Sequence, residues 1–351
     1  MIVMIKILVF CLFVCLNLSA AEPTLRAMVA QMVMVGFNGA SLNETSVKVM
    51  ISDAGYSRFG GVMLLGRNIK DKAGLKALTL AVKNKAPNLF IAIDEEGGKV
   101  SRLGGLGVKF ISAKEVGETL DIKQAHELYL KMGKNLKELG INMNFAPVVD
   151  LHSDTSPIIG KKERAFSANG AKVSLYANTF MDAMGANGII SVMKHFPGHG
   201  NSESDSHKDK SVVKLTRDAL LPYRDAISQG RALAIMSGHL YVSNLDDKNP
   251  ATLSHITINS LLRTELGFGG VVISDDMLMK GVGTESLKEK IFKFINAGGD
   301  ILLFSEFNLD GRKSAELVKQ HIIDLVNEKR ISKERIEASY KRIMSLKKLI
   351  K

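Results

Sequence analysis

The stretch GGVVISDDM, residues 269–277, carries the pattern on which the fold prediction rests. Two glycines are followed by a short apolar run, and the run ends in two aspartates. An apolar run without polar alternation is typical of a parallel strand that is buried on both faces. The stretch therefore predicts a buried strand that places a carboxylate at one edge of a sheet.

Seven further apolar runs along the chain have the same character; they span residues 29–37, 60–66, 89–96, 141–150, 189–196, 232–242 and 298–304. Helical spacing of apolar residues predicts amphipathic helices between these runs, at residues 75–85, 123–139, 171–184, 217–228 and 287–297, and a helical tail over 315–350. Glycines typical of helix ends follow four of them, at Gly140, Gly188, Gly230 and Gly298. Strands and helices thus alternate along the chain.

This alternation predicts an α/β fold, a (β/α)₈ TIM-type barrel in a single domain over residues 22–351, for which ~250 residues is a usual size before insertions. An open, doubly wound sheet is the alternative. Polar residues stand at several strand ends, among them Asp94, Asp150, Lys194, His239 and Asp275. Since a barrel gathers the carboxyl ends of all its strands around one mouth, these residues favour the barrel. No linker suggests a second domain.

Residues 1–21 are interpreted as a signal peptide. Lys6 precedes the apolar run ILVFCLFVCLNL, and Ser19-Ala20-Ala21 offers small residues for cleavage. The run is shorter than the ~20 apolar residues that span a bilayer. An uncleaved N-terminal anchor is the alternative. Lipidation of Cys15 is disfavoured because Val14 precedes it, where such sites have a small residue. We expect an exported protein, periplasmic or secreted, without stable membrane insertion after cleavage.

Both cysteines, Cys11 and Cys15, lie in this segment, so the mature chain would have no disulfide, cysteine nucleophile or cysteine metal ligand. The net charge of the chain is +11, and the lysines are spread along the sequence. No basic stretch is interleaved with aromatic residues, so nucleic acid is not an expected partner. A solvated basic surface with weak attraction to an anionic polymer, such as cell wall, is the simpler interpretation.

The aspartates of VVISDDM are the first candidates for chemistry. Neighbouring residues in a strand point to opposite faces, so only one of the two should face the mouth. A carboxylate there can act as a nucleophile, a base or a metal ligand. A helix N-cap is the alternative role. We predict a functional role for Asp275 and a capping or supporting role for Asp276.

A second candidate is LFIAIDEEGGKVSRL, residues 89–103. Asp94, Glu95 and Glu96 end a strand just before a turn at Gly97-Gly98. Three consecutive carboxylates are hard to explain by stability, although a solvated rim is possible. Arg102 follows closely enough to return to the same mouth.

The third candidate is KHFPGHGNSESDSH, residues 194–207. A metal site would use His195, His199, Asp205 and His207, but Lys194 would repel the ion and no helical or knuckle spacing is present. A phosphate loop is disfavoured because neither glycine pattern matches. We favour an acid–base dyad in which Asp205 orients His207 and raises its basicity.

KHFPGHG followed by DSH, together with IDEEGGKVSRL, NFAPVVD and GFGGVVISDDMLM, resembles glycoside hydrolase family 3. The resemblance is closest to its single-domain bacterial β-N-acetylhexosaminidases (β-N-acetylglucosaminidases), which act on cell-wall muropeptides. It runs from about residue 28 to the C-terminal IEASYKRIMSLKK, and the four motifs keep the family's order. It implies the same barrel.

The resemblance also implies roles for individual residues. The nucleophile would be Asp275, and the acid/base His207 paired with Asp205. Sugar-binding positions would be Asp94, Arg102, Arg164, Lys194 and His195, and His239 would be a further residue of the mouth. Lys99 stands where the family usually has arginine, Gly238 stands where alanine is common, and PIIGKKERAF is slightly longer than the usual spacing before the residue that matches Arg164.

The implied reaction is retaining exo-hydrolysis of terminal β-linked N-acetylglucosamine from peptidoglycan fragments, with a covalent intermediate on Asp275. The chain ends after the barrel, so the acid would come from the barrel's own DSH loop. We expect no metal or cofactor, a carbohydrate as the partner, and a monomer. The alternatives are a β-glucosidase-like hydrolase, a phosphorylase, a metal-dependent hydrolase and a non-catalytic glycan-binding barrel.

Overall fold

The computed structural model describes residues 22–200, 202 and 210–350. The predicted signal segment, Asp205 and His207 therefore lie outside the described residues. Eight strands form one parallel sheet, and each strand corresponds to one of the eight apolar runs. The strands are β1 (Val33–Val35), β2 (Gly61–Leu64), β3 (Phe90–Ile93), β6 (Met143–Asn144), β7 (Ile190–Phe196), β9 (Ala234–Ser237), β11 (Val271–Ser274) and β12 (Leu302–Phe304).

The sheet closes on itself. Each strand pairs with its successor in the set, and β1 pairs in parallel with β12. A parallel bridge between Ile273 and Ile301 joins the two remaining edges, where the Ser274 amide donates to the Ile301 carbonyl at 2.9 Å. Every residue of the eight strands is buried, as expected for strands covered on both sides. The predicted (β/α)₈ barrel is thus confirmed.

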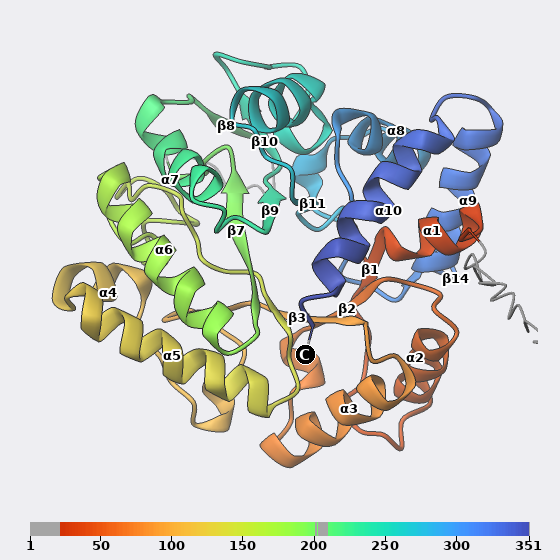
Figure 1. Ribbon diagram of the computed structural model, residues 1–351, viewed down its shortest axis with the longest axis horizontal. Helices are drawn as coiled ribbons and strands as arrows, with labels where there is room; N and C mark the ends of the chain where they lie inside the picture. Colours follow the sequence, from red (N-terminus) through yellow and green to blue (C-terminus); the bar gives the residue numbers. More distant parts are fainter. Residues whose placement is uncertain (1–21, 201, 203–209, 351) are drawn as a thin grey trace, which may run out of the picture.

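Helices surround the barrel (Figure 1). They are α1 (Leu25–Gln31), α2 (Thr45–Gly55), α3 (Lys72–Lys85), α4 (Ala113–Thr119), α5 (Ile122–Glu138), α6 (Gly170–Ala186), α7 (Arg217–Ser228), α8 (Leu287–Ala297), α9 (Ser314–Asn327) and α10 (Lys333–Lys347). A π-helical segment spans Ile256–Glu265, and single 3₁₀ turns span Gly66–Asn68, Gly104–Leu106, Ala251–Leu253 and Lys280–Val282. Among the described residues, no helix is long and apolar enough to span a membrane.

Local sequence accounts for many of the helix boundaries. Side chains of Asp71, Asp121, Asn169, Thr216 and Ser286 each accept a hydrogen bond from a backbone amide in the first turn of the helix that follows. These caps satisfy amides that have no partner within the helix. Gly298 ends α8 at a φ of 109°, a conformation that favours glycine.

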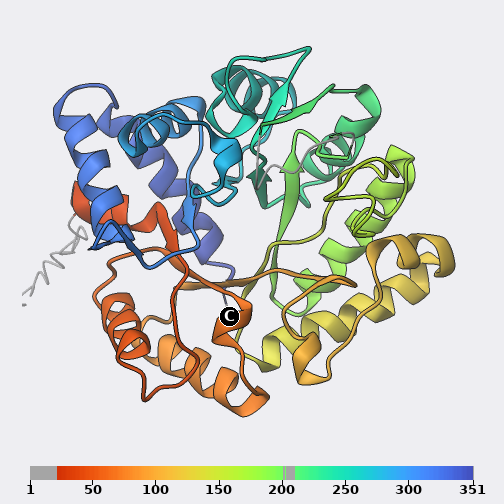
Figure 2. The ribbon, with the colours of Figure 1, turned by 180° about the vertical axis from the view of Figure 1, so that it is seen from behind.

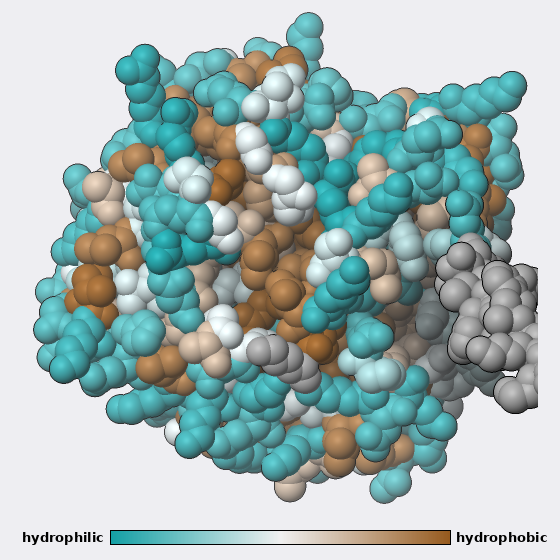
Figure 3. All heavy atoms as spheres, viewed as in Figure 1, coloured by the Kyte–Doolittle hydropathy of each residue, from teal (hydrophilic) through white to brown (hydrophobic). Residues whose placement is uncertain are grey.

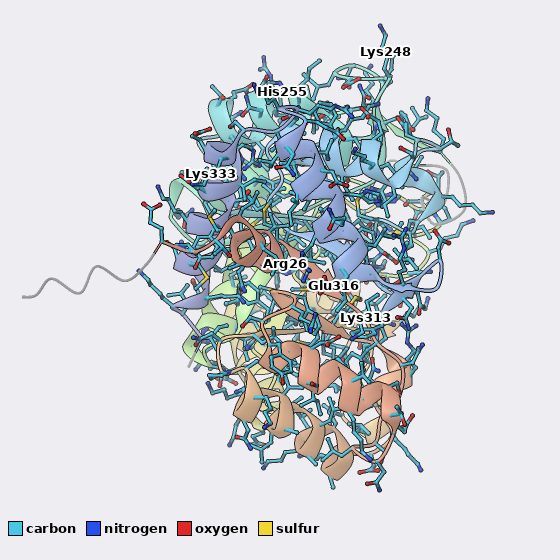
Figure 4. The ribbon with its side chains drawn as sticks, turned by 90° about the vertical axis from the view of Figure 1, so that its right-hand side faces the viewer. Arg26, Lys248, His255, Lys313, Glu316 and Lys333 are labelled. Carbon is cyan, nitrogen blue, oxygen red and sulfur yellow. The ribbon has the colours of Figure 1, made fainter. Side chains whose placement is uncertain are left out.

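The N-terminal run and the tail differ from their predictions. Residues 29–31 of the first predicted strand belong to α1, because the Thr24 cap starts a helix that uses the same apolar residues. The predicted helical tail is divided into α9 and α10 by a turn in which Lys329 has a φ of 59°. Figure 4 shows Arg26 of α1 and Glu316 of α9 pointing toward each other, and these side chains form an ion pair at 2.7 Å.

Three two-stranded ribbons accompany the barrel. They are antiparallel β4 (Glu95–Gly97) with β5 (Val100–Ser101), parallel β8 (Ser211–Val213) with β10 (Leu240–Val242), and antiparallel β13 (Asn308–Leu309) with β14 (Arg312–Lys313). Each includes residues that follow a barrel strand. Figure 2 shows the molecule from behind, with the helices again arranged around the barrel.

The last helix covers the amino ends of the strands. Lys347 of α10 donates to the carbonyl of Gly60, just before β2. A cavity of about 440 Å³ remains between α10 and the segments that lead into β9 and β11, lined in part by Leu233, Val271, Leu346 and Leu349. In Figure 3, apolar side chains gather near the middle of the face on which α10 lies in Figure 1.

Candidate active site

The carboxyl ends of the strands bring together most of the predicted site residues. Asp94 follows β3, Asp275 follows β11, and Lys194 and His195 lie among the last residues of β7. In the ring of eight strands, β3 and β11 are four strands apart. Asp94 and Asp275 therefore stand on opposite sides of the barrel mouth.

A cavity of about 420 Å³ opens at this mouth. Six of the predicted site residues line it: Asp94, Arg102, Arg164, Lys194, His195 and Asp275. The charged residues Glu96, Lys99, Lys162 and Asp276 line it as well, and apolar residues complete the wall, among them Met63, Phe145, Met236 and Leu303. The cavity thus combines an apolar surface with a dense set of ionisable groups.

Five of these residues form a continuous charge network: Arg102, Asp94, Lys194, Glu96 and Arg164. The Lys194 ammonium lies 2.7 Å from Asp94 and 2.6 Å from Glu96. Arg102 donates to Asp94 at 3.2 Å. Arg164 binds Glu96 with two nitrogens, at 2.8 and 2.9 Å. Each carboxylate is shared by two cations, so the side chains hold one another in place.

Electrostatics keep this network charged despite its burial. Burial raises the pKa of Glu96, but the adjacent Arg164 and Lys194 outweigh it and hold that pKa well below its ordinary range. Burial lowers the pKa of Lys194, yet Asp94 and Glu96 raise it above its ordinary value. An uncompensated charge in this place would be strongly unfavourable. The network is therefore a fixed set of donors and acceptors around the cavity.

His195 is held from below by Asp150. Its Nδ1 lies 2.7 Å from Asp150 Oδ2, and its Nε2 lies 3.3 Å from an Arg164 nitrogen. Since arginine can only donate, Nε2 is the acceptor, and Nδ1 carries the proton that is donated to Asp150. Burial raises the pKa of Asp150, but the interactions with His195 and His199 together outweigh it and lower that pKa overall. The buried carboxylate thus selects one tautomer and one ring orientation.

Asp275 and Asp276 follow β11 with different surroundings. The Asp275 amide donates to the Ser237 carbonyl, and Asp275 Oδ1 accepts the Asp276 amide at 2.8 Å. Asp276 Oδ1 accepts the amides of Leu278 and Ser305, each at 3.1 Å. Burial raises the pKa of Asp276. Asp276 thus ties down the turn after β11, the supporting role expected for it. The expectation that only one of the two aspartates faces the mouth was wrong, because the chain turns after Ser274 and both side chains line the cavity.

His239 lies behind this turn and is not among the residues that line the cavity. Its Nε2 donates to the Asp276 carbonyl at 2.9 Å, and its Nδ1 lies 3.0 Å from the Thr252 hydroxyl. Burial lowers the pKa of His239, which favours the neutral ring. The structure therefore places this predicted mouth residue as a buried support for the Asp275–Asp276 turn.

Glu95, Glu96 and Asp150 support the site, although the sequence prediction assigned them no individual role. Glu95 is buried, and its Oε2 accepts the amides of Arg102 and Leu103 at 2.9 and 3.0 Å. The run of three carboxylates before Gly97-Gly98 was the available signal for Glu95 and Glu96. Which of the three faces the cavity depends on the β4–β5 turn, and that turn could not be read from composition.

The alternatives for residues 194–207 can be examined only in part. Burial and the neighbouring His195 lower the pKa of His199 to about 4, so its ring is neutral at pH 7. Across residues 22–200, 202 and 210–350, no group of three or more His, Cys, Asp or Glu side chains is placed to hold a metal. The proposed dyad of Asp205 and His207 falls outside these residues and stays a prediction.

Known proteins resemble this chain over most of its length. The model of the glycosyl hydrolase family 3 N terminal domain matches residues 24–346. "Beta-hexosaminidase A" of Pseudoalteromonas piscicida is 32% identical over 319 residues, which cover 82% of this chain and 53% of that protein. "Beta-hexosaminidase LpqI" of Mycobacterium tuberculosis is 37% identical over 234 residues, which cover 62% of this chain and 58% of that protein. The chain thus spans little more than half the length of these two relatives.

A solved structure agrees with the sequence comparisons. The glycoside hydrolase family 3 β-N-acetylglucosaminidase from Paenibacillus sp. str. FPU-7 superposes with a TM-score of 0.84 and 32% sequence identity. The match covers 93% of this chain and 62% of that protein. The expected family is confirmed: the chain belongs to glycosyl hydrolase family 3.

Proposed function

We propose that this protein hydrolyses terminal β-linked N-acetylglucosamine residues with retention of anomeric configuration. The observation that carries the proposal is the placement of Asp275 on the wall of a 420 Å³ cavity, across the mouth from the charge network. The names of the similar proteins, hexosaminidase and β-N-acetylglucosaminidase, support the choice of sugar.

The charge network and His195 would hold the hydroxyl groups of the sugar. Asp94 can accept hydrogen bonds from hydroxyl groups. Arg102, Lys194 and Arg164 can donate hydrogen bonds to hydroxyl oxygens. Because these side chains already bind one another, little ordering is required when the sugar enters. Met63, Phe145, Met236 and Leu303 offer apolar contacts to the ring face and to an acetyl methyl group.

In the proposed mechanism, a carboxylate attacks the anomeric carbon and a proton donor assists the leaving oxygen. Asp275 would attack, forming a covalent glycosyl-enzyme. His207, held by Asp205, would protonate the leaving group and then, as a neutral base, activate the water that releases the sugar. The turn tied down by Asp276 and His239 would hold Asp275 at the mouth.

Peptidoglycan fragments outside the cytoplasm are the proposed substrates. The support is the signal-like segment 1–21 and the net charge of +11, which favours anionic polymers. Export, action as a monomer, and independence from metals or cofactors belong to the same proposal.

Hydrolysis of a chromogenic β-N-acetylglucosaminide, beside the matching β-glucoside, tests this function. We expect release from the N-acetyl substrate only, unaffected by chelator, abolished in Asp275→Ala and strongly reduced in His207→Ala. Preference for the plain glucoside would overturn the choice of sugar. Formation of sugar 1-phosphate in phosphate buffer would indicate a phosphorylase, and loss of activity with chelator a metal-dependent hydrolase. Sugar binding without turnover by folded wild type would indicate a binding protein.

A further inference from the structure

Two exposed lysines, Lys99 and Lys162, line the mouth of the cavity. Lys99 belongs to the turn between β4 and β5, whereas Lys162 lies in the loop between β6 and α6. The Lys99 ammonium donates to the Lys161 carbonyl at 3.0 Å, so the two loops touch beside Lys162. The lysines therefore form one cluster, the rim pair, on the side of β3 and β6.

The rim pair differs from the cations deeper in the cavity. Arg102, Lys194 and Arg164 each contact a buried or half-buried carboxylate within 3.2 Å. Among the described residues, the carboxylate that pairs with Lys99 is that of Glu163, which is partly exposed and lies 3.6 Å away. No ion pair joins Lys162 to a carboxylate within the described part of the chain. The charge of the rim pair is thus much less compensated than that of the charge network.

Between Lys162 and Arg164, the backbone has a conformation that residues other than glycine rarely adopt. Glu163 has a φ of 59°, in the left-handed region, although it is not a glycine. This turn lets the residues on both sides of it, Lys162 and Arg164, line the same cavity. Left-handed non-glycine residues are uncommon and cluster at functional sites. The conformation supports a role for Lys162 beyond solvation of the surface.

We propose that Lys99 and Lys162 form a subsite for an anionic group of the substrate, a carboxylate or a phosphate. The inference rests on the proposed glycosidase function and narrows its substrate class to β-N-acetylglucosaminides that carry such a group. A lysine ammonium on a flexible stem can follow a mobile anion, and two such groups at a solvated mouth suit a substituent that projects from the cavity. The anion is either part of the aglycone or attached to the terminal sugar.

Binding of non-cleavable thioglycosides tests the subsite without any turnover. One pair would be a thio-linked disaccharide whose second sugar carries a lactyl carboxylate, beside its carboxamide. The other would be a methyl thio-β-N-acetylglucosaminide with and without a 6-phosphate. By calorimetry at low salt, we expect wild type to prefer the anionic member of one pair about five- to tenfold, which is typical of two exposed charge contacts, and to lose the preference as salt rises.

The double variant Lys99→Gln/Lys162→Gln should bind both members of each pair equally, and thermal melting would show that it folds. Lys333→Gln is the matched control, since this exposed lysine begins α10 (Figure 4) and should leave the preference intact. A preference in the first pair assigns the anion to the aglycone, and one in the second assigns it to the terminal sugar. Equal binding or no binding by wild type, or a preference that survives the double variant, would overturn the subsite.

Hydrolysis of the corresponding neutral oxygen glycoside separates the two proposals. An anion preference in binding without any hydrolysis would retain the subsite and overturn the glycosidase. Hydrolysis without an anion preference would retain the glycosidase and overturn the subsite.

Discussion

Glu96 is the buried carboxylate that Lys194 and Arg164 share, and we predict that it is essential for holding them in place. In Glu96→Gln, two buried cations lose a charged partner, which should cost about 3 kcal/mol of stability. Displacement of Lys194 and Arg164, the proposed sugar-binding side chains, should also lower kcat/KM about 100-fold. Urea unfolding and steady-state kinetics would measure both effects.

The control for Glu96 is Glu337→Gln, which removes the exposed ion-pair partner of Lys333. Such pairs contribute less than about 1 kcal/mol, so both stability and kcat/KM should be nearly unchanged. Equal effects of the two substitutions would contradict the role assigned to Glu96.

His199 gives a prediction for pH dependence. Burial, followed by the neighbouring His195, lowers its pKa from 6.5 to about 4, so the folded protein keeps this ring neutral where the unfolded chain takes up a proton. Stability should therefore fall as pH is lowered from 6.5 to 4, by at most about 1.4 kcal/mol per pH unit from this group. Unfolding at several pH values should show a shallower slope for His199→Gln. Identical slopes would show that His199 does not contribute.

Individual site residues could be predicted from the sequence where an ionisable side chain stands in a recognisable motif. Six of the nine predicted site residues line one cavity. Asp94, Lys194, His195 and Asp275 end or follow strands whose hydrophobic runs are visible in the sequence. Arg102 and Arg164 lie in loops; Arg102 was expected from its closeness to the carboxylates that end β3, and Arg164 was found through the family resemblance. His239 also follows a strand, but its burial behind Asp276 depends on a turn that the pattern does not encode. The supporting role of Asp150 depends on contact with the distant His195, and that of Glu95 depends on the path of the β4–β5 turn, so neither was predictable.

At the level of elements, the β4–β5 ribbon positions Arg102. Glu95 accepts hydrogen bonds from two backbone amides there. We expect Glu95→Ala to free the turn, because each such hydrogen bond to a carboxylate is worth ~1.5–3 kcal/mol. The substitution should raise KM about tenfold with a smaller change in kcat. Glu95→Gln should keep most of the affinity, because its side-chain amide oxygen can still accept both backbone hydrogen bonds. Kinetics of the three proteins would check this, and a KM unaltered in Glu95→Ala would contradict it.

Helices with a strong amphipathic pattern were predicted closely, and α7 and α8 have the predicted bounds. The strand β6 was predicted too long: regular pairing covers Met143 and Asn144, and Pro147, which has no amide hydrogen to donate, lies in the rest of the apolar run. Apolar residues 29–31 were assigned to a strand, since a run this short does not distinguish a buried helix from a buried strand.

For the molecule as a whole, a second buried charge cluster lies at the end of the barrel opposite the mouth. Asp300, which precedes β12, is fully buried and binds Arg263 at 2.7 Å and Arg342 at 2.8 Å. We predict that Asp300→Ala lowers the stability by about 3–5 kcal/mol, because it leaves these arginines without a buried carboxylate. Below the melting temperature, kcat/KM per folded molecule should stay unchanged. A large loss of kcat/KM in folded protein would contradict this separation.

The architecture was the most predictable property, since eight apolar runs alternating with amphipathic helices are compatible with few folds. The mouth followed from it, because parallel strands bring their carboxyl ends together. The Glu163 turn and the rim pair were not predictable, since they depend on how two loops meet.

The central claim is that Asp275 is the nucleophile of a retaining reaction on N-acetylglucosamine. Its most direct test is mass spectrometry of the protein after incubation with a slow fluorinated N-acetylglucosaminyl fluoride, followed by peptide mapping. We predict a sugar adduct on Asp275 in wild type and no adduct in Asp275→Ala. An adduct on another residue, or steady turnover with no trapped intermediate on Asp275, would contradict the account.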